Sequence, residues 1–360
     1  SQQGIQGPGR SVCVSLTSVY LEVPELAHLT VRRWWLWITV LLVAVVFVAV
    51  ISVGLGSTWV PASDVLAAFG SSRGVNAVIV REVRLPRVLL AGVVGGGLAV
   101  AGVVFQALLR NSLADPFVLG ISGGAGLGAV IAVSIGGGVS IAGLAGVPLF
   151  AFFGALIAII VVYLFARGGG RVNLHTMLLA GVVTNSVCSS AIMALTITLS
   201  YDQLQTVMFW LMGHLSTMPL PLVGKLALYV GIGLVFLMAI GRDLNQMSLG
   251  ESQAATLGTN VESVKRIAFV GASLVTGASV AAAGLIGFVG LIIPHAVRIS
   301  TGPDHRLLIP ASFLAGAAFL MLADALARTV IAPTELPVGV ITALIGGPVF
   351  LVLLKQRMKR

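Results

Sequence analysis

Apolar runs of about twenty residues recur along almost the whole chain, and they restrict it to very few folds. A helix of that length crosses the hydrocarbon core of a bilayer. Charged residues make up only 9% of the chain, whereas a soluble domain carries roughly 25%. The chain therefore has too little charge to cover a surface in water. The pattern predicts an all-α integral membrane protein.

Polar breaks divide the sequence into ten candidate spans. These are residues 36–55, 88–109, 117–135, 147–166, 177–199, 222–240, 267–285, 286–298, 307–328 and 338–354. Residues 59–87 predict an amphipathic loop, and residues 201–218 an outer segment with a short re-entrant helix. Residues 1–30 precede the spans, and we leave open whether they are a natural cytoplasmic tail or an expression remnant. Residues 31–360 are expected to form one transmembrane domain.

Basic residues are distributed unevenly between the two sides that ten spans create. Ten spans place both termini on one side, and most of the 21 Lys and Arg residues fall there. Basic residues collect on the cytoplasmic side of membrane proteins, so we expect both termini to be cytoplasmic. The net charge of +9 then reflects topology. Because no basic patch is interleaved with aromatic residues, nucleic acid is not an expected partner.

The most polar stretch of the second half includes residues 248–266, which this topology places in the cytoplasm. Two capping boxes, a pattern that opens helices, are present: Ser248 with Glu251 and Thr259 with Glu262. Gly258 stands where a helix C-terminus favours positive φ. We predict two short helices. A capped surface loop and a docking element for another protein both fit this pattern.

The chain lacks the sequence patterns of several enzyme and transporter classes. No phosphate-binding loop, zinc-protease motif or nucleophile elbow occurs. Cys13 and Cys188 are too few for a disulfide framework or metal site. Asp324 is the one clear carboxylate inside a span, and Arg328 lies one turn later. Ion-coupled transport usually needs more intramembrane charge, so the energy source is expected outside this chain.

One span carries an unusual number of polar residues. Within residues 177–199 we identify four candidates for lining a pathway: Thr184, Asn185, Ser186 and Ser189. Polar groups at membrane depth normally face protein or a water-filled path. Serine and threonine also bond back to their own helix, and both interpretations stay open.

Several long motifs occur in order between about Trp35 and Leu354. They are RLPRVLLAGVVGGGLAVAGVVFQALLRNSLADPFVLGISGGAGLG at residues 84–128, LLAGVVTNS at 178–186, FWLMG at 209–213, LGESQAATLG at 249–258, GLIGFVGLIIPHAVR at 284–298, GPDHRLLIPAS at 302–312, LADALAR at 322–328 and ELPVGVITALIGGPVFLVLL at 335–354. On these motifs the chain resembles the FecCD family. Its members are permease subunits of ABC importers for iron–siderophore chelates, haem and cobalamin.

The resemblance implies a type II ABC importer permease fold with about ten transmembrane helices per protomer. It implies a homodimer with the pathway on its two-fold axis, in contact with membrane lipid. Two separate ATP-binding cassette subunits and a periplasmic or lipid-anchored substrate-binding protein would complete the complex in a bacterial inner membrane. ATP and Mg²⁺ would be used by those partner subunits. This chain itself is expected to bind no cofactor or metal and to have no enzymatic activity.

The resemblance also implies three groups of site residues. ATPase coupling would involve Leu249, Gly250, Glu251, Ala254, Ala255, Leu257 and Gly258. A cytoplasmic gate would include Asn111, Ser112, Leu113, Asn173, Leu174, His175 and Thr176. The binding protein would dock on Arg84, Arg87 and Arg328, although anchoring at the membrane interface is the alternative for each arginine. The chain departs from the family pattern at Ser112, where proline is usual, and at His214.

The combined pattern predicts the permease of an importer for a large metal chelate, an iron–siderophore complex or haem. Cobalamin stays open as the cargo. An ion-coupled secondary transporter is the alternative from another class, disfavoured because such folds often show inverted repeats and mid-membrane charge. An intramembrane enzyme is disfavoured by the missing nucleophile and metal patterns.

Overall fold

A computed structural model describes residues 30–56, 74–136, 146–168 and 171–358. The described part is almost wholly helical. Its two strands, β1 (Arg167–Gly168) and β2 (Arg171–Val172), form a small antiparallel hairpin with Arg167 opposite Val172. The all-α prediction is therefore confirmed for these residues.

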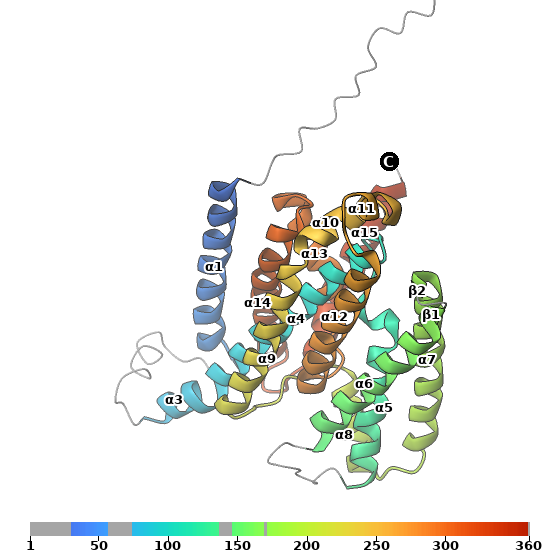
Figure 1. The fold of residues 1–360 in the computed structure, drawn as a ribbon. Coiled ribbons are helices and arrows are strands. Elements are labelled where there is room, and N and C mark those ends of the chain that lie inside the picture. Colours follow the sequence, from blue (N-terminus) through green and yellow to red (C-terminus); the bar gives the residue numbers. More distant parts are fainter. Residues whose placement is uncertain (1–29, 57–73, 137–145, 169–170, 359–360) are drawn as a thin grey trace, which may run out of the picture.

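Ten apolar helices correspond in order to the ten spans expected from sequence. Seven are long and apolar enough to cross a membrane and three are shorter. They are α1 (Val31–Gly54), α4 (Leu85–Leu108), α5 (Ile121–Ser134), α6 (Gly146–Ala166), α7 (Leu174–Thr196), α9 (Leu220–Ala239), α12 (Val261–Ala283), α13 (Val289–Thr301), α14 (His305–Thr329) and α15 (Val338–Met358). The start of α1 and the end of α15 lie on the same side of the bundle, as an even number of spans requires (Figure 1).

The segment expected to be a loop before the second span is largely helical where it is described. The short helix α3 (Val75–Val78) leads into the π-helical segment η1 (Ile79–Arg84) and then α4. Proline has no backbone N–H and strains an ordinary helix interior. Pro86 stands at the start of α4, and the N–H of Leu85 donates to Val80. The wider π-helical turn accommodates the proline without ending the helix. Residues 59–73 of this expected loop lie outside the described residues.

Two breaks interrupt other spans. The third span begins as the 3-10 helix η2 (Pro116–Leu119) and turns at Gly120, whose φ is 87°, into α5. The short helix expected within residues 201–218 is present as α8 (Tyr201–Leu211). It opens with a capping box in which Ser200 and Gln203 each satisfy a backbone N–H of the other.

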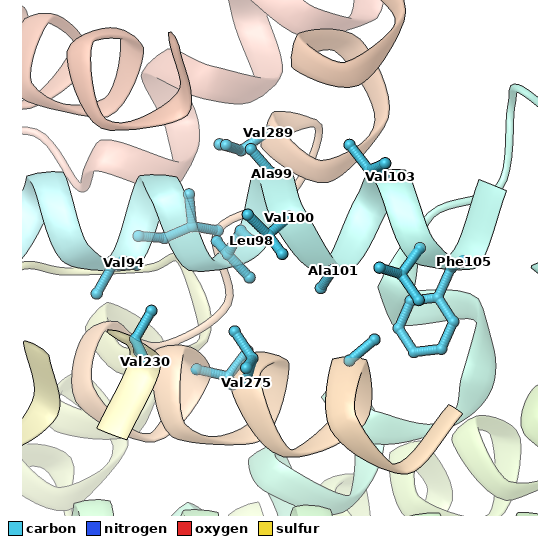
Figure 2. Close-up of a cluster of buried hydrophobic side chains, with 14 of the residues drawn as sticks. Val94, Leu98, Ala99, Val100, Ala101, Val103, Phe105, Val230, Val275 and Val289 are labelled. Atoms are coloured by element: carbon cyan, nitrogen blue, oxygen red, sulfur yellow. The ribbon is translucent and has the colours of Figure 1, made fainter. Parts of the chain in front are cut away.

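Helix α4 is the core of the bundle. Almost all of its residues from Pro86 to Leu108 are buried, and it packs against α14, α12, α13 and α9. Figure 2 shows its side chains between Val230 of α9 and Val275 of α12 on one side and Val289 of α13 on the other. Because lipid tails are as apolar as these side chains, close packing must hold such helices together.

Glycines bring the backbones of α4 and its neighbours into direct contact. A Cβ on Gly102 would overlap the carbonyl oxygen of Gly290 in α13, and one on Gly95 would overlap that of Gly316 in α14. The same relation joins α5 and α6 through Gly124 and Gly154. Small residues at helix interfaces allow this approach, and the glycines of α4 serve that purpose here.

We expect Gly102→Ala to lower the stability of the bundle by about 1–3 kcal/mol, because the added methyl group must push α13 away from α4. The measurement is the thermal unfolding midpoint of the purified protein in detergent. Gly231→Ala in α9 is the matched control, since a Cβ there meets no atom within 4 Å. Equal midpoints for the two variants would contradict the proposed close contact.

Candidate functional site

The polar stretch after α9 forms two short helices before α12. Helix α10 (Gly241–Ser248) and helix α11 (Glu251–Thr256) are separated by Gly250, whose φ is 125°. Gly258 ends the second helix with a φ of 88°, as expected from sequence. Both helices lie on the side of the bundle where α1 begins and α15 ends (Figure 1).

The two expected capping boxes are wrong. Ser248 is the last residue of α10, and its hydroxyl donates to the carbonyl of Asn245 at 2.6 Å. The second box is displaced by one residue, because Asn260 caps α12 by accepting from the N–H of Ser263 at 3.1 Å. Thr259 instead bonds to Gln246 and closes the loop between α10 and α12. Asparagine is a strong N-cap, and Asn260 rather than Thr259 caps α12.

The expected ATPase-coupling residues divide into an exposed and a buried set. Leu249 and Leu257 flank α11 and are 62% and 57% exposed. Large apolar side chains exposed on a polar element mark an interaction surface. Ala255 is also exposed, whereas Ala254 is fully buried against its own chain. The expectation that the Ala254 side chain contacts a partner is therefore not met, because the helix turns that face toward the bundle.

A hydrogen-bonded cluster fixes α10 to the turn between α13 and α14. Asn245 donates to the carboxylate of Asp304 at 2.8 Å and accepts from the N–H of His305 at 2.8 Å. Sequence analysis did not identify this contact. The feature of the sequence that could have indicated this contact is the Asp304–His305 pair at the start of α14. Asp304 is the N-cap of that helix and accepts from the N–H of Arg306.

The carboxyl of Asp304 is held in its ionised form. Although burial alone would raise its pKa, hydrogen bonds from Arg306 and Asn245 lower the pKa to about 2. The unfolded value is about 3.9, so the stability that Asp304 contributes is present above about pH 4. It is lost as the pH falls toward 2.

The two expected gate loops have defined local structure. Arg110 has a φ of 48° at the end of α4, and the side chain of Asn111 accepts from the N–H of Leu113 at 3.1 Å. Asn173 caps α7 by accepting from the N–H groups of His175 and Thr176 at 3.0 and 3.2 Å. The remaining gate candidates, Ser112 and Leu174, are half-buried. The gate role of these loops stays a prediction.

Two of the polar residues expected to line a pathway in α7 bond either to their own helix or to a neighbouring element. Ser186 donates to the carbonyl of Val182 at 3.0 Å. For Ser186, the structure therefore shows the bond to its own helix that was one of the two interpretations. Asn185 donates to the carbonyl of Phe117 at 2.9 Å and accepts from the N–H of Gly123 at 3.0 Å. It thereby bridges the break between η2 and α5. Thr184 is half-buried and Ser189 is exposed, and their pathway role stays a prediction.

An apolar groove of about 930 Å³ lies beside α7, between α5 and α6. Phe150, Phe153, Val183 and Val187 are among its lining residues. Within the described ranges, no group of three or more His, Cys, Asp or Glu side chains is arranged to hold a metal ion. The groove therefore offers apolar contact, with no cluster of charges at its wall.

At the opposite end of the bundle from α11, two arginines pair with one buried carboxylate and a third, Arg84, bonds to the end of α1. Asp324 in α14 is fully buried and pairs with Arg87 at 3.0 Å and with Arg328 at 2.9 Å. Arg87 also pairs with Glu335 at 2.6 Å. The expected Asp324–Arg328 contact across one helical turn is confirmed.

The same arginines satisfy the carbonyl groups that a helix end leaves without partners. Arg328 donates to Leu55 at 2.7 Å and to Ser52 at 3.0 Å. Arg84 donates to the carbonyls of Val53 and Gly54 at 3.0 and 2.8 Å. Positive charge at a helix C-terminus is favourable, so this cluster fixes the end of α1 to α4 and α14.

The guanidinium of Arg328, one of the three expected docking groups, is bonded within this chain. Its Nε, Nη1 and Nη2 atoms all donate within the chain. Arg84, Arg87 and Arg328 are all buried, since each is needed to neutralise Asp324 or to close α1. Their role in docking a binding protein stays a prediction.

We expect Asp324→Asn to destabilise the protein by about 3–5 kcal/mol, because it removes the charge that pairs with two buried guanidinium groups. Glu335→Gln is the matched control, since its carboxylate is partly exposed and such pairs contribute about 0–1 kcal/mol. Thermal unfolding in detergent measures both. A shift for Asp324→Asn no larger than the shift for Glu335→Gln would contradict the importance of the buried pair.

The sequence pattern of the FecCD transport family matches residues 41–356, almost the whole described bundle. The chain belongs to the FecCD transport family. The cobalamin import system permease protein BtuC of Halobacterium salinarum is 45% identical over 79% of this chain and 75% of the relative. The hemin transport system permease protein HmuU of Yersinia pestis is 42% identical over 78% and 84%. The ABC transporter permease protein YvrB of Bacillus subtilis is 40% identical over 85% and 90%.

Solved structures share the architecture. A metal-chelate type ABC transporter in an inward-facing conformation superposes with a TM-score of 0.76 at 30% identity, over 89% of this chain and 99% of that chain. PsaBC from Streptococcus pneumoniae has a TM-score of 0.52 at 17% identity, over 81% and 94%, and shares the fold alone. The predicted family and permease fold are confirmed.

Proposed function

We propose that this chain is the membrane-spanning permease subunit of a binding-protein-dependent ABC importer for a large metal chelate. The observation that supports it best is α11, a short helix flanked by exposed leucines and held on a bundle of ten apolar helices. Such an element suits a motor protein that supplies energy from outside. The sequence has no ATP-binding motif of its own.

The partners follow from the same arrangement. Two ATP-binding cassette subunits, which use ATP and Mg²⁺, would dock on the side of α10 and α11. A second copy of this chain would complete the pathway, and a substrate-binding protein would deliver cargo at the opposite side, near α8 and the arginine cluster. The complex would lie in the inner, or plasma, membrane with both termini of this chain in the cytoplasm.

The cargo class is an iron chelate, either haem or an iron–siderophore complex. One relative is a hemin permease, and one solved neighbour is described as a metal-chelate type transporter. Cobalamin is the second candidate, because the relative from Halobacterium salinarum, at 45% identity, is a cobalamin permease. Selectivity can reside in the binding protein, so the ligand that the cognate binding protein retains decides between them.

Uptake into proteoliposomes tests the proposal. We expect accumulation of haem, an iron–siderophore complex or cobalamin only when the permease, its ATPase subunits, the binding protein and ATP are all present. Substituting a proton or sodium gradient for ATP should give no accumulation. Uptake driven by an ion gradient without the ATPase would instead favour a secondary transporter.

We expect Ala255→Glu to reduce ATP-driven uptake about tenfold or more, because a glutamate buried in the interface with the ATPase lacks a partner charge. Ala255→Ser is the matched control, since it is small and uncharged. Uptake and ATP hydrolysis are measured on the same reconstituted complexes. Normal uptake by both variants would show that α11 is not the docking helix.

A further inference from the structure

A buried lysine joins three separate elements beneath α11. Lys265 lies in the second turn of α12, and its side chain is only 4% exposed. Its Nζ atom contacts Glu251 of α11 at 2.7 Å, Glu262 of α12 at 3.2 Å and the carbonyl of Val172 in β2 at 3.3 Å. An ammonium group has three donors, so each donor has an acceptor and each acceptor belongs to a different element.

The second carboxylate oxygen of Glu262 completes the connection to β2. It accepts from the N–H of Val172 at 2.9 Å. Lys265 and Glu262 thus bind both backbone groups of one residue. Val172 directly precedes Asn173, the N-cap of α7. The chain of contacts therefore runs from the first residue of α11 to the residue before the cap of α7.

The burial of Lys265 makes this connection stiff. Ion pairs between exposed, flexible side chains are weakened by water and salt. The Lys265 ammonium is shielded from both, although the side chains of Glu251 and Glu262 are 39% and 27% exposed. Removing both carboxylates would leave the buried lysine charge without compensation. The three contacts of Lys265 therefore link α11, α12 and β2 at one buried ammonium group.

We propose that Lys265 is a positioning residue that makes α11 and the start of α7 move as one unit. The inference rests on the proposed function, in which α11 receives the motion of an ATPase. Motion of α11 reaches Glu251 first, then Lys265 with Glu262, and then the backbone of Val172. Through these contacts, a displacement of α11 driven by ATP hydrolysis would reach the start of α7 without passing through the apolar packing of the bundle.

The test compares Lys265→Met and Glu251→Gln with Arg266→Met in reconstituted complexes with ATPase and binding protein. Arg266 is the next residue along α12, is exposed, and donates to the backbone of its own helix. Molecules taken up per ATP hydrolysed are measured for each complex. We expect this ratio to fall at least about fivefold in Lys265→Met, the lower end of coupling between linked sites. Assembly and ATP hydrolysis persist, and Arg266→Met keeps the full ratio.

A second readout follows the motion itself. Spin labels on the exposed residues Gln253 and Thr176, in a cysteine-free background diluted with unlabelled chains, report the distance between α11 and the start of α7. In the wild type we expect the same distance with and without nucleotide. In Lys265→Met the distance should change or broaden between nucleotide states, because the two elements then move separately.

Three outcomes would overturn the proposal. One is full coupling in Lys265→Met with an unchanged distance. Another combines two results. Assembly, hydrolysis and uptake fall in proportion in Lys265→Met, and coupling is complete in Glu251→Gln. Lys265 would then have a purely structural role. A wild-type complex that transports without any ATPase would overturn both this inference and the proposed function, so the two failures are distinguishable.

Discussion

The close approach of helix backbones around α4 is the constraint on which the rest of the structure depends. In lipid there is no hydrophobic force between helices, so van der Waals contact must hold the bundle together. Gly95 and Gly102 permit this contact with α14 and α13, and almost every residue of α4 is buried as a result. Helices α7 and α11 lie outside this packed centre and have few buried residues.

Polar interactions are concentrated at the two ends of the bundle. At one end, Asp324 and three arginines close the C-terminus of α1 against α4 and α14. At the other, Asn245 fixes α10 to the start of α14, and Lys265 joins α11 to β2. Buried charge is costly unless it is paired, and the charged groups of each cluster pair with one another within this chain. The two ends of the permease are therefore held by separate polar clusters around one packed core.

The sequence predicted the fold well and the site only in part. Apolar runs located the ten apolar helices of the described residues, because span length is imposed by the bilayer. The loop expected before the second span was wrong for residues 75–84, since a π-helical turn accommodates Pro86 within a longer helix. The capping boxes at Ser248 and Thr259 were also wrong. Local spacing identifies several residues able to cap a helix, and tertiary contacts such as Thr259 with Gln246 decide which one does.

The sequence by itself determined the membrane class, the order of the apolar helices, the family and the position of the two short helices after α9, because these depend on composition and on local order. The tertiary structure decided what individual polar side chains contact. The spacing of Arg328 placed it one turn from Asp324, whereas only the structure shows that carbonyls more than 270 positions away accept from its Nη1 and Nη2 atoms. Lys265 looked like an ordinary basic residue beside an apolar span. Only the packing of α11 and β2 around it supplies its acceptors, since contacts between residues distant in sequence follow from helix packing.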